Sequence, residues 1–246
     1  MKRILCINDL SGVGLCSLSV CMPILGGISE VCPLPTAVLS AHTGYKGFTF
    51  RNLTEDFPGI FAHWKSMNIT FDYIYTGYFA NEKQIDYTLD YIAKQNSTVI
   101  VDPVMGDDGA LYTGFFETFP AKMLTLCKEA DIITPNLTEA SFLLGIPTPK
   151  SYTEESVRDA CKQLHTITGA NVAITGLSFT PDTISSALYQ DGSLQIFTRK
   201  KHLPENIPGT GDMFSSVLVR EQIGGNSLED SVNTAMDYVI DYIGQR

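Results

Sequence analysis

The stretch Gly209–Asp212 places two glycines and a threonine directly before an aspartate. Glycine lets the backbone adopt positive φ angles and approach a ligand closely. The apolar residues that follow recur along one face of a predicted helix: Met213, Phe214, Val217 and Leu218. Unpaired amides at a helix N-terminus favour anions, so the loop predicts a phosphate cradle with the Asp212 carboxylate beside it. The alternative is that Asp212 only caps the helix.

Other polar side chains follow short apolar runs of the chain. They are Asn8 and Asp9, Thr76–Tyr78, Asp102, Thr134 with Asn136 and Glu139, and Thr175 with Gly176. In a doubly wound sheet, ligands bind beyond the carboxyl ends of the strands, so these groups are expected to meet at one edge. Taken singly, Asp102 could end a strand, Asn136 could cap a helix and His42 could be an ordinary loop residue. Their number favours a common site for phosphate, metal or a polar ligand.

The elements that must position these groups are short strands alternating with helices. Strands are expected at Arg3–Ile7, Glu30–Cys32, Tyr73–Tyr75, Thr98–Val101, Asp131–Thr134 and Val172–Thr175. The central runs are mostly β-branched and lack polar alternation, which is typical of buried parallel strands. Asp191-Gly192 predicts a hairpin turn between Ile184–Tyr189 and Leu194–Thr198.

Helix signals lie between the strands. Asn81 is expected to cap a helix, and Ser151 with Glu154 and Ser227 with Asp230 resemble capping boxes. No internal repeat or linker divides the chain. The alternation predicts an α/β fold in which residues 1–246 form one domain around a doubly wound, mainly parallel sheet flanked by helices.

Composition narrows the classes of function. Seventeen Lys and Arg stand against 27 Asp and Glu, a net charge of −10, so neither nucleic acid nor an anionic membrane is an expected partner. The apolar part of MKRILCIN is too short for a signal peptide, and no stretch approaches the ~20 apolar residues of a membrane span. The six cysteines contain no CxxC pair, so free thiols in a reducing, cytoplasmic setting are expected.

Two common nucleotide motifs are missing or incomplete. The sequence has no GxxxxGK[ST] and is therefore not a P-loop enzyme. SGVGLCS follows the first predicted strand, but Ser17 stands where a dinucleotide fingerprint requires its third glycine. A dehydrogenase stays open as a weak alternative.

Five segments occur in the order seen in one known family: SAHTGY, DYIYTGY, VDPVMGD, ADIITPNLTEA and the GTGD of residues 209–212. With them the chain resembles the ribokinase superfamily and, within it, the pyridoxal kinases, over nearly its whole length. The resemblance implies a ribokinase-like three-layer sandwich. It also implies a homodimer that phosphorylates the 5′-hydroxymethyl group of pyridoxal, pyridoxine or pyridoxamine with ATP.

The resemblance also implies roles for individual residues. Asp212 matches the catalytic base, and Gly209, Thr210 and Gly211 match the anion hole that binds the moving phosphoryl group. The implied substrate pocket comprises Asp9, Ser11, His42, Thr43 and Tyr78. The implied nucleotide contacts are Asp107, Asn136, Thr175 and Gly176, together with Thr210 and Gly211. Asp102, Thr134 and Glu139 match the metal region, where Mg²⁺ is expected and family members often add a monovalent cation such as K⁺.

Two departures from the family pattern keep alternatives open. Asp9 stands where many pyridoxal kinases have serine, which favours hydroxymethylpyrimidine kinases, although those usually end the anion-hole motif in cysteine rather than in an aspartate such as Asp212. The chain stops at Arg246, whereas relatives commonly run further. Part of the adenine pocket is therefore expected to be missing, and a nucleotide-binding relative without activity is a further alternative.

Overall fold

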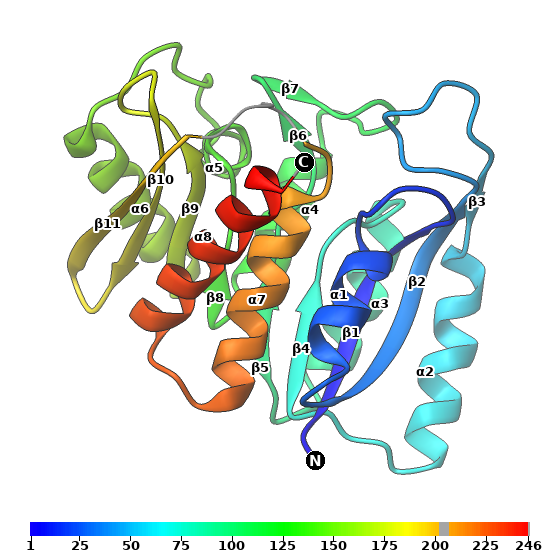
Figure 1. The fold of residues 1–246 in the computed structure, drawn as a ribbon. Helices are drawn as coiled ribbons and strands as arrows, with labels where there is room; N and C mark the ends of the chain where they lie inside the picture. Colours follow the sequence, from blue (N-terminus) through cyan, green and yellow to red (C-terminus); the bar gives the residue numbers. More distant parts are fainter. Residues whose placement is uncertain (202–206, 246) are drawn as a thin grey trace.

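A nine-stranded sheet forms the centre of the molecule in the computed structural model, which describes residues 1–201 and 207–245 (Figure 1). Its strands are β1 (Arg3–Ser11), β2 (Glu30–Leu39), β3 (Phe50–Asn52), β4 (Tyr73–Thr76), β5 (Thr98–Val101), β8 (Ile132–Ile133), β9 (Asn171–Leu177), β10 (Thr183–Gln190) and β11 (Ser193–Lys200). Their order is β11-β10-β9-β8-β5-β4-β1-β2-β3. The six strands β2, β1, β4, β5, β8 and β9 are parallel, and β3 and β10 run against them. Strand β11 pairs antiparallel with β10 and so runs in the direction of the parallel strands. The predicted doubly wound, mainly parallel sheet is confirmed.

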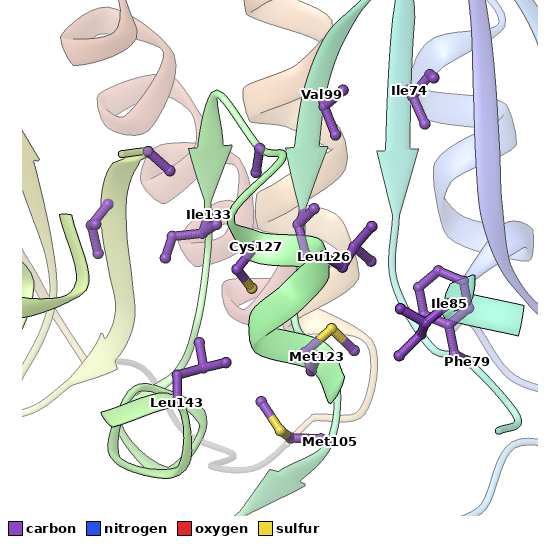
Figure 2. Packing of buried hydrophobic residues seen from close by; sticks show 14 of the residues in the cluster. Ile74, Phe79, Ile85, Val99, Met105, Met123, Leu126, Cys127, Ile133 and Leu143 are labelled. Atoms are coloured by element: carbon purple, nitrogen blue, oxygen red, sulfur yellow. The ribbon is translucent and has the colours of Figure 1, made fainter. Parts of the chain in front are cut away.

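Helices cover both faces of this sheet. They are α1 (Leu18–Leu25), α2 (Phe57–Ser66), α3 (Glu82–Ile92), α4 (Phe119–Cys127), α5 (Leu137–Leu144), α6 (Glu154–Thr168), α7 (Thr210–Gly224) and α8 (Leu228–Gly244), with a short 3-10 turn at Thr54–Asp56. One core lies under α2 to α6, and a second lies under α1, α7 and α8. Figure 2 shows part of the first core, where Met123, Leu126 and Cys127 of α4 pack over the strands.

The side chains of the central strands are divided between the two cores. Leu5 and Ile7 of β1 face the first core, whereas Ile4 and Cys6 face the second, because successive side chains of a strand point to opposite faces. Burial on both faces explains why the sequence shows continuous apolar runs here. All six cysteines are free thiols, as expected. Among the described residues, no helix is both long and apolar enough to cross a membrane.

Several predicted caps and turns are confirmed. Asn81 caps α3 by accepting hydrogen bonds from the amides of Lys83 and Gln84. Ser227 caps α8 and accepts from Asp230 N at 3.0 Å, but the predicted box is not complete, because the Asp230 carboxylate accepts from Ser227 Oγ, whereas a box requires it to accept from Ser227 N. The Asp191-Gly192 turn joins β10 to β11 with both residues at positive φ.

The predicted capping box of Ser151 and Glu154 is wrong. Thr153 caps α6, and its box partner is Ser156, whose hydroxyl accepts from Thr153 N at 2.9 Å. A serine at the third helical position can return a hydrogen bond as Glu does, so the helix begins two residues later than the Ser-x-x-Glu pattern predicted.

Strand β2 also runs further than predicted, through Pro33 and Pro35 to Leu39. Proline cannot donate to a ladder and is tolerated where a strand edge carries no partner. Strand β3 pairs only with Ala37–Leu39, so the outer edge of β2 beside both prolines is free of β3.

A second hairpin was not predicted. Strands β6 (Gly106–Asp107) and β7 (Ala110–Leu111) are joined by Asp108 and Gly109, both at positive φ. This Asp-Gly turn has the form that two-residue hairpin loops prefer, so the signal was present in the sequence.

Candidate active site

Backbone hydrogen bonds tie together the segments just beyond the carboxyl ends of the central strands. They run from Gly77 N to Ile7 O, from Asp102 N to Thr76 O, from Thr134 N to Val101 O and from Thr175 N to Pro135 O, at 2.8–3.0 Å. The polar groups expected at strand ends are therefore brought to one edge of the sheet.

Helix α7 begins at this edge, with Asp212 in its first turn. Its N-cap is Gly209, which has a φ of 84° and no side chain to occupy the first amides of the helix. A Cβ on residue 209 would lie 2.0 Å from the carbonyl oxygen of Leu15, so only glycine fits. Thr210 Oγ1 bonds back to Ile207 O at 3.2 Å, and Gly211 is exposed. The arrangement leaves amides available to an anion in front of the helix.

Asn8 links the catalytic candidate to the rest of the site. Its Nδ2 donates to Asp212 Oδ1 at 3.3 Å, while its Oδ1 accepts from Tyr78 N at 2.8 Å and from Asp9 N at 3.0 Å. Gly77 makes room for it, because a Cβ on residue 77 would lie 2.3 Å from Asn8 Nδ2. No specific role for Asn8 was predicted, although its position directly after the apolar run Arg3–Ile7 is the signal that could have identified it.

The environment of Asp212 sets its protonation. Burial raises the pKa of Asp212 to about 6, and the negative charge of Asp9 adds to the shift. Hydrogen bonds from the backbone of Ser17 and the side chain of Asn8 oppose it. A carboxylate with a pKa near 6 can accept a proton from a substrate at neutral pH.

Asp9 is buried and anchors the loop that faces Asp212. Ser17 Oγ donates to Asp9 Oδ1 at 2.5 Å, and Ser11 Oγ donates to Asp9 Oδ2 at 3.1 Å. Ser17 has a φ of 56° and a ψ of −129°, a strained backbone for a residue with a side chain. The two hydroxyl contacts hold that strain in place. Burial raises the pKa of Asp9.

His42 lies in a loop that packs on the Gly12–Ser17 segment. His42 N donates to Val13 O at 3.1 Å, and a Cβ on Gly14 would lie 2.0 Å from the His42 ring. Its Nδ1 accepts from Gly44 N at 3.1 Å, which fixes the ring. The side chain is half-buried, as the simple loop interpretation also expects, and the next residue, Thr43, is exposed.

Tyr78 forms another side of the same region. Its ring lies 5.4 Å from that of Phe115, and the side chain is half-buried. Burial raises the pKa of Tyr78 to about 12, and the charge of Asp9 contributes. His42 in turn lowers the pKa of Asp9. Tyr78 and His42 are therefore both within electrostatic range of Asp9.

A buried polar cluster lies beside α7. Ser215 Oγ donates to Asp102 Oδ2 at 3.0 Å and lies 2.9 Å from Thr134 Oγ1. Burial raises the pKa of Asp102 to about 8, and the charge of Asp212 is the next contribution. Ser215 was not predicted, because the sequence places it on the apolar helix after the GTGD motif.

Glu139 has its own set of partners. Its carboxylate accepts from Met105 N at 3.1 Å and from Asn136 N at 2.9 Å, and Asn136 caps α5 in return. The helix-cap interpretation of these two residues is therefore confirmed. Burial, followed by the charge of Asp102, raises the pKa of Glu139.

The carboxylates of Asp102 and Glu139 fit a cation that takes only one or two of its ligands from the protein. Within the described ranges, no group of three or more His, Cys, Asp or Glu side chains is arranged to hold a metal. Asp102 and Glu139 are nevertheless buried carboxylates whose pKa values rise, so a nearby cation would stabilise their charged forms. Mg²⁺ commonly binds through one or two carboxylates, waters and substrate phosphates.

The expected nucleotide contacts lie further along the same edge. Asn136 and Thr175 form a parallel bridge, and Asn136 Nδ2 donates to Gly106 O at 2.8 Å. Gly176 is exposed at a φ of 69°. Asp107, in the β6–β7 hairpin, is exposed and accepts from the amide of the next residue.

Comparison with known proteins points to one family. Residues 53–246 match the model of the family described as phosphomethylpyrimidine kinase. A Bacteroides thetaiotaomicron protein assigned as a phosphomethylpyrimidine kinase, in a crystal form with pyridoxal, is 40% identical, with a TM-score of 0.91 over 99% of this chain and 86% of that one.

Two pyridoxal kinases of known structure are also similar to this chain. The Lactobacillus plantarum enzyme is 32% identical, with a TM-score of 0.91 over 97% of this chain and 86% of that one. The Leishmania donovani enzyme, in complex with ADP and pyridoxamine, is 25% identical, with a TM-score of 0.86 over 98% of this chain and 85% of that one. The fold of this chain is thus similar, over nearly its whole length, to the folds of two solved pyridoxal kinases.

Proposed function

This chain belongs to the phosphomethylpyrimidine kinase family, and on that premise we propose that it is a pyridoxal kinase. It transfers the γ-phosphoryl group of ATP to the 5′-hydroxymethyl group of pyridoxal, pyridoxine or pyridoxamine. The observation that carries the proposal is Asp212, a carboxylate with a pKa of about 6 in the first turn of a helix whose N-cap is glycine. The related structure with pyridoxal supports a B6 vitamer as one substrate, and the related structure with ADP and pyridoxamine supports ATP as the other.

The proposed chemistry uses the backbone amides after Gly209 and the carboxylate of Asp212, at the start of α7. The amides that follow Gly209 stabilise negative charge on the transferred phosphoryl group, and Thr210 and Gly211 belong to the same turn. Asp212 accepts the proton of the substrate hydroxyl while the hydroxyl oxygen attacks the γ-phosphorus and ADP leaves. The hydrogen bond from Asn8 holds the Asp212 carboxylate toward the substrate side.

The proposed vitamer pocket surrounds Asp9. Tyr78 supplies an aromatic face on which the pyridine ring of the vitamer would stack. His42 and Thr43 come from the loop that packs on Gly14, and Ser11 comes from the end of β1. The Asp9 carboxylate accepts hydrogen bonds, so it favours vitamers that present an N–H or O–H donor.

The proposed phosphate and metal region lies on the other side of Asp212. Asp102, Thr134 and Glu139 would hold Mg²⁺, which would neutralise charge on the nucleotide phosphates, and a monovalent cation such as K⁺ would bind nearby. Asp107, Asn136, Thr175 and Gly176 would contact the nucleotide. The metal role is supported by the buried Asp102 carboxylate, whose charged form a cation would stabilise. The nucleotide role is supported by the Asn136–Thr175 bridge, which brings these two residues together.

We propose further that residues 1–246 act as one kinase domain and that two chains form a homodimer. The support is an exposed apolar pair in the sheet: Leu10 is 37% exposed, and its register partner Val38 is 41% exposed. Large contiguous apolar patches on a protein surface mark interaction sites, and we propose that this pair forms the centre of one. The cytoplasm is the proposed location, because ATP is available there.

The test is kcat/KM for pyridoxal, pyridoxine, pyridoxamine and the hydroxymethylpyrimidine, with ATP and Mg²⁺, in the wild type and in Tyr78→Ala and Asp9→Ser. We expect the wild type to prefer a B6 vitamer. Tyr78→Ala should raise the vitamer KM much more than the ATP KM, and Asp9→Ser should reorder the four alcohols. A wild type that prefers the pyrimidine would replace the proposal with a hydroxymethylpyrimidine kinase. Loss of ATP affinity alone in Tyr78→Ala would show that the pocket lies elsewhere.

A further inference from the structure

Helix α7 carries a second polar side chain toward the strand ends, one turn after Asp212. Ser215 is buried, and its hydroxyl joins residues that follow two different strands. It lies 3.0 Å from Asp102 Oδ2, just after β5, and 2.9 Å from Thr134 Oγ1, just after β8. One side chain of the helix thus connects two neighbouring strand ends.

The direction of these hydrogen bonds follows from the chemistry of the groups. A bound cation would hold Asp102 in its ionised form, and an ionised carboxylate only accepts hydrogen bonds. In that state the single hydroxyl hydrogen of Ser215 goes to Asp102, along the contact between Ser215 Oγ and Asp102 Oδ2. The hydrogen between Thr134 and Ser215 must therefore come from Thr134. The chain runs from Thr134 through Ser215 to Asp102, and it leaves Thr134 Oγ1 with lone pairs but no free hydrogen. Such an oxygen presents the correct polarity to a cation.

We infer that Ser215 is a positioning residue that fixes Asp102 and Thr134 to the helix bearing Asp212, so that the phosphate and metal region and the base form one rigid unit. This inference rests on the proposed function. Ser215 acts by holding the oxygen atoms of Asp102 and Thr134, which would bind the metal ion. Partners of this kind, one layer behind the groups that bind a metal, typically change metal affinity or activity by about 10–100-fold when removed.

The next residue on the helix supplies a matched control. Ser216 is also fully buried, and its Oγ has no hydrogen-bond partner among the residues that the structure describes. Ser215→Ala and Ser216→Ala remove the same atom from the same helix, but only the first change breaks hydrogen bonds. A general effect of shortening a buried serine in α7 would appear in both variants.

The experiment measures the binding of Mn²⁺ and ADP without turnover, by electron paramagnetic resonance of Mn²⁺, alongside kcat. We expect Ser215→Ala to weaken Mn²⁺ binding in the presence of ADP by about 10–100-fold. Ser216→Ala should stay within about twofold of the wild type, since it leaves no partner unpaired. Equal Mn²⁺ affinity in the two variants would overturn the inference.

Thr134 tests the same hydrogen-bond chain from its other end, including the case in which Ser215→Ala does not fold. Thr134→Val keeps the side-chain shape but removes the hydroxyl, and it should lose Mn²⁺ affinity, whereas Thr134→Ser should keep it. Equal Mn²⁺ affinity in Thr134→Val and Thr134→Ser would also overturn the inference. A wild type that binds Mn²⁺ and ADP but phosphorylates no vitamer would refute the proposed function, while the comparison of binding still decides the role of Ser215.

Discussion

At the scale of single residues, the site keeps a carboxylate charged where burial opposes its charge. Burial raises the pKa of Asp212 to about 6, while Ser17 and Asn8 favour the ionised form. At pH 7 such a group is ionised about ten to one, yet it remains a much stronger base than an exposed aspartate. The residues that set this balance come from β1 and from the loop after it, far from Asp212 in the sequence.

Asp212→Asn should lower kcat by ~10²–10⁴-fold, because the amide cannot accept the substrate proton. Binding of ADP should survive, since the amides of the α7 N-terminus are unchanged. The wild-type kcat/KM should rise with pH through about 6 and then level off, because the free enzyme's base works only when it is deprotonated and is protonated below that pH. The measurements are kcat/KM between pH 5 and 8 and kcat at pH 7 in both proteins, and near-wild-type turnover in the variant would reduce Asp212 to a helix cap.

At the scale of elements, the sequence predicted what depends on local patterns. Apolar runs located the buried strands, and the turn Asp191-Gly192 and the caps Asn81 and Ser227 were confirmed. Ser151 failed as a cap because Thr153 offers the same chemistry two residues later. Ser151 and Thr153 are both suitable N-caps in the loop before α6, and tertiary packing decides which of them caps the helix.

The contacts within the site depend on pairs of residues far apart in the chain. Asn8 meets Asp212 across 204 positions, and Ser215 meets Asp102 across 113. Nothing in the spacing of the sequence indicates that the Ser215 side chain, on an otherwise apolar helix, turns inward to contact Asp102. The GTGD motif was visible because its residues are adjacent, and the functional roles carried over from the family resemblance stay predictions.

The junction between the loop and α7 makes a prediction at this scale. Gly209→Ala should lower the free energy of unfolding by at least ~1–2 kcal/mol, because alanine resists a φ of 84° and its Cβ would meet Leu15 O. Displacement of the anion-binding amides should also lower kcat, on the order of 10²-fold. Urea unfolding and steady-state kinetics provide the two measurements.

Gly211→Ala is the control for that change. A Cβ on residue 211 would meet nothing within 4 Å, and its φ is not positive, so this variant should unfold at the same urea concentration as the wild type or a higher one. Equal stability of the two alanine variants would mean that the close approach of Leu15 to residue 209 has no energetic consequence.

At the scale of the whole molecule, the site draws residues from both sides of the division between the two cores. The sheet separates a core under α2 to α6 from a core under α1, α7 and α8, and α7 belongs wholly to the second. Asp212 and Ser215 cross that division by reaching Asn8, Asp102 and Thr134 at the strand ends. The position of the base therefore depends on how the second layer of helices sits on the sheet, and not on the loop alone.

The proposed dimer tests the molecule from its outer surface. Leu10 and Val38 are partners on adjacent parallel strands, and together they expose an apolar surface close to the β3 edge of the sheet. A symmetric dimer buries the same patch from both chains, so a charge at its centre meets its own copy. Val38→Glu should therefore convert the dimer to a monomer, as measured by sedimentation equilibrium, with an unchanged circular dichroism spectrum.

The control for this change is Ile167→Glu on α6. Ile167 is 38% exposed, close to the 41% of Val38, but its helix packs on β9 and β10, away from the β3 edge. If exposed apolar area alone drove association, both glutamates would weaken it; if the Leu10–Val38 surface is the interface, only Val38→Glu will. A monomeric wild type, or a Val38→Glu protein that still sediments as a dimer, would remove this surface as the interface. Because β1 also carries Asn8 and Asp9, loss of the dimer should be accompanied by a higher vitamer KM than that of Ile167→Glu.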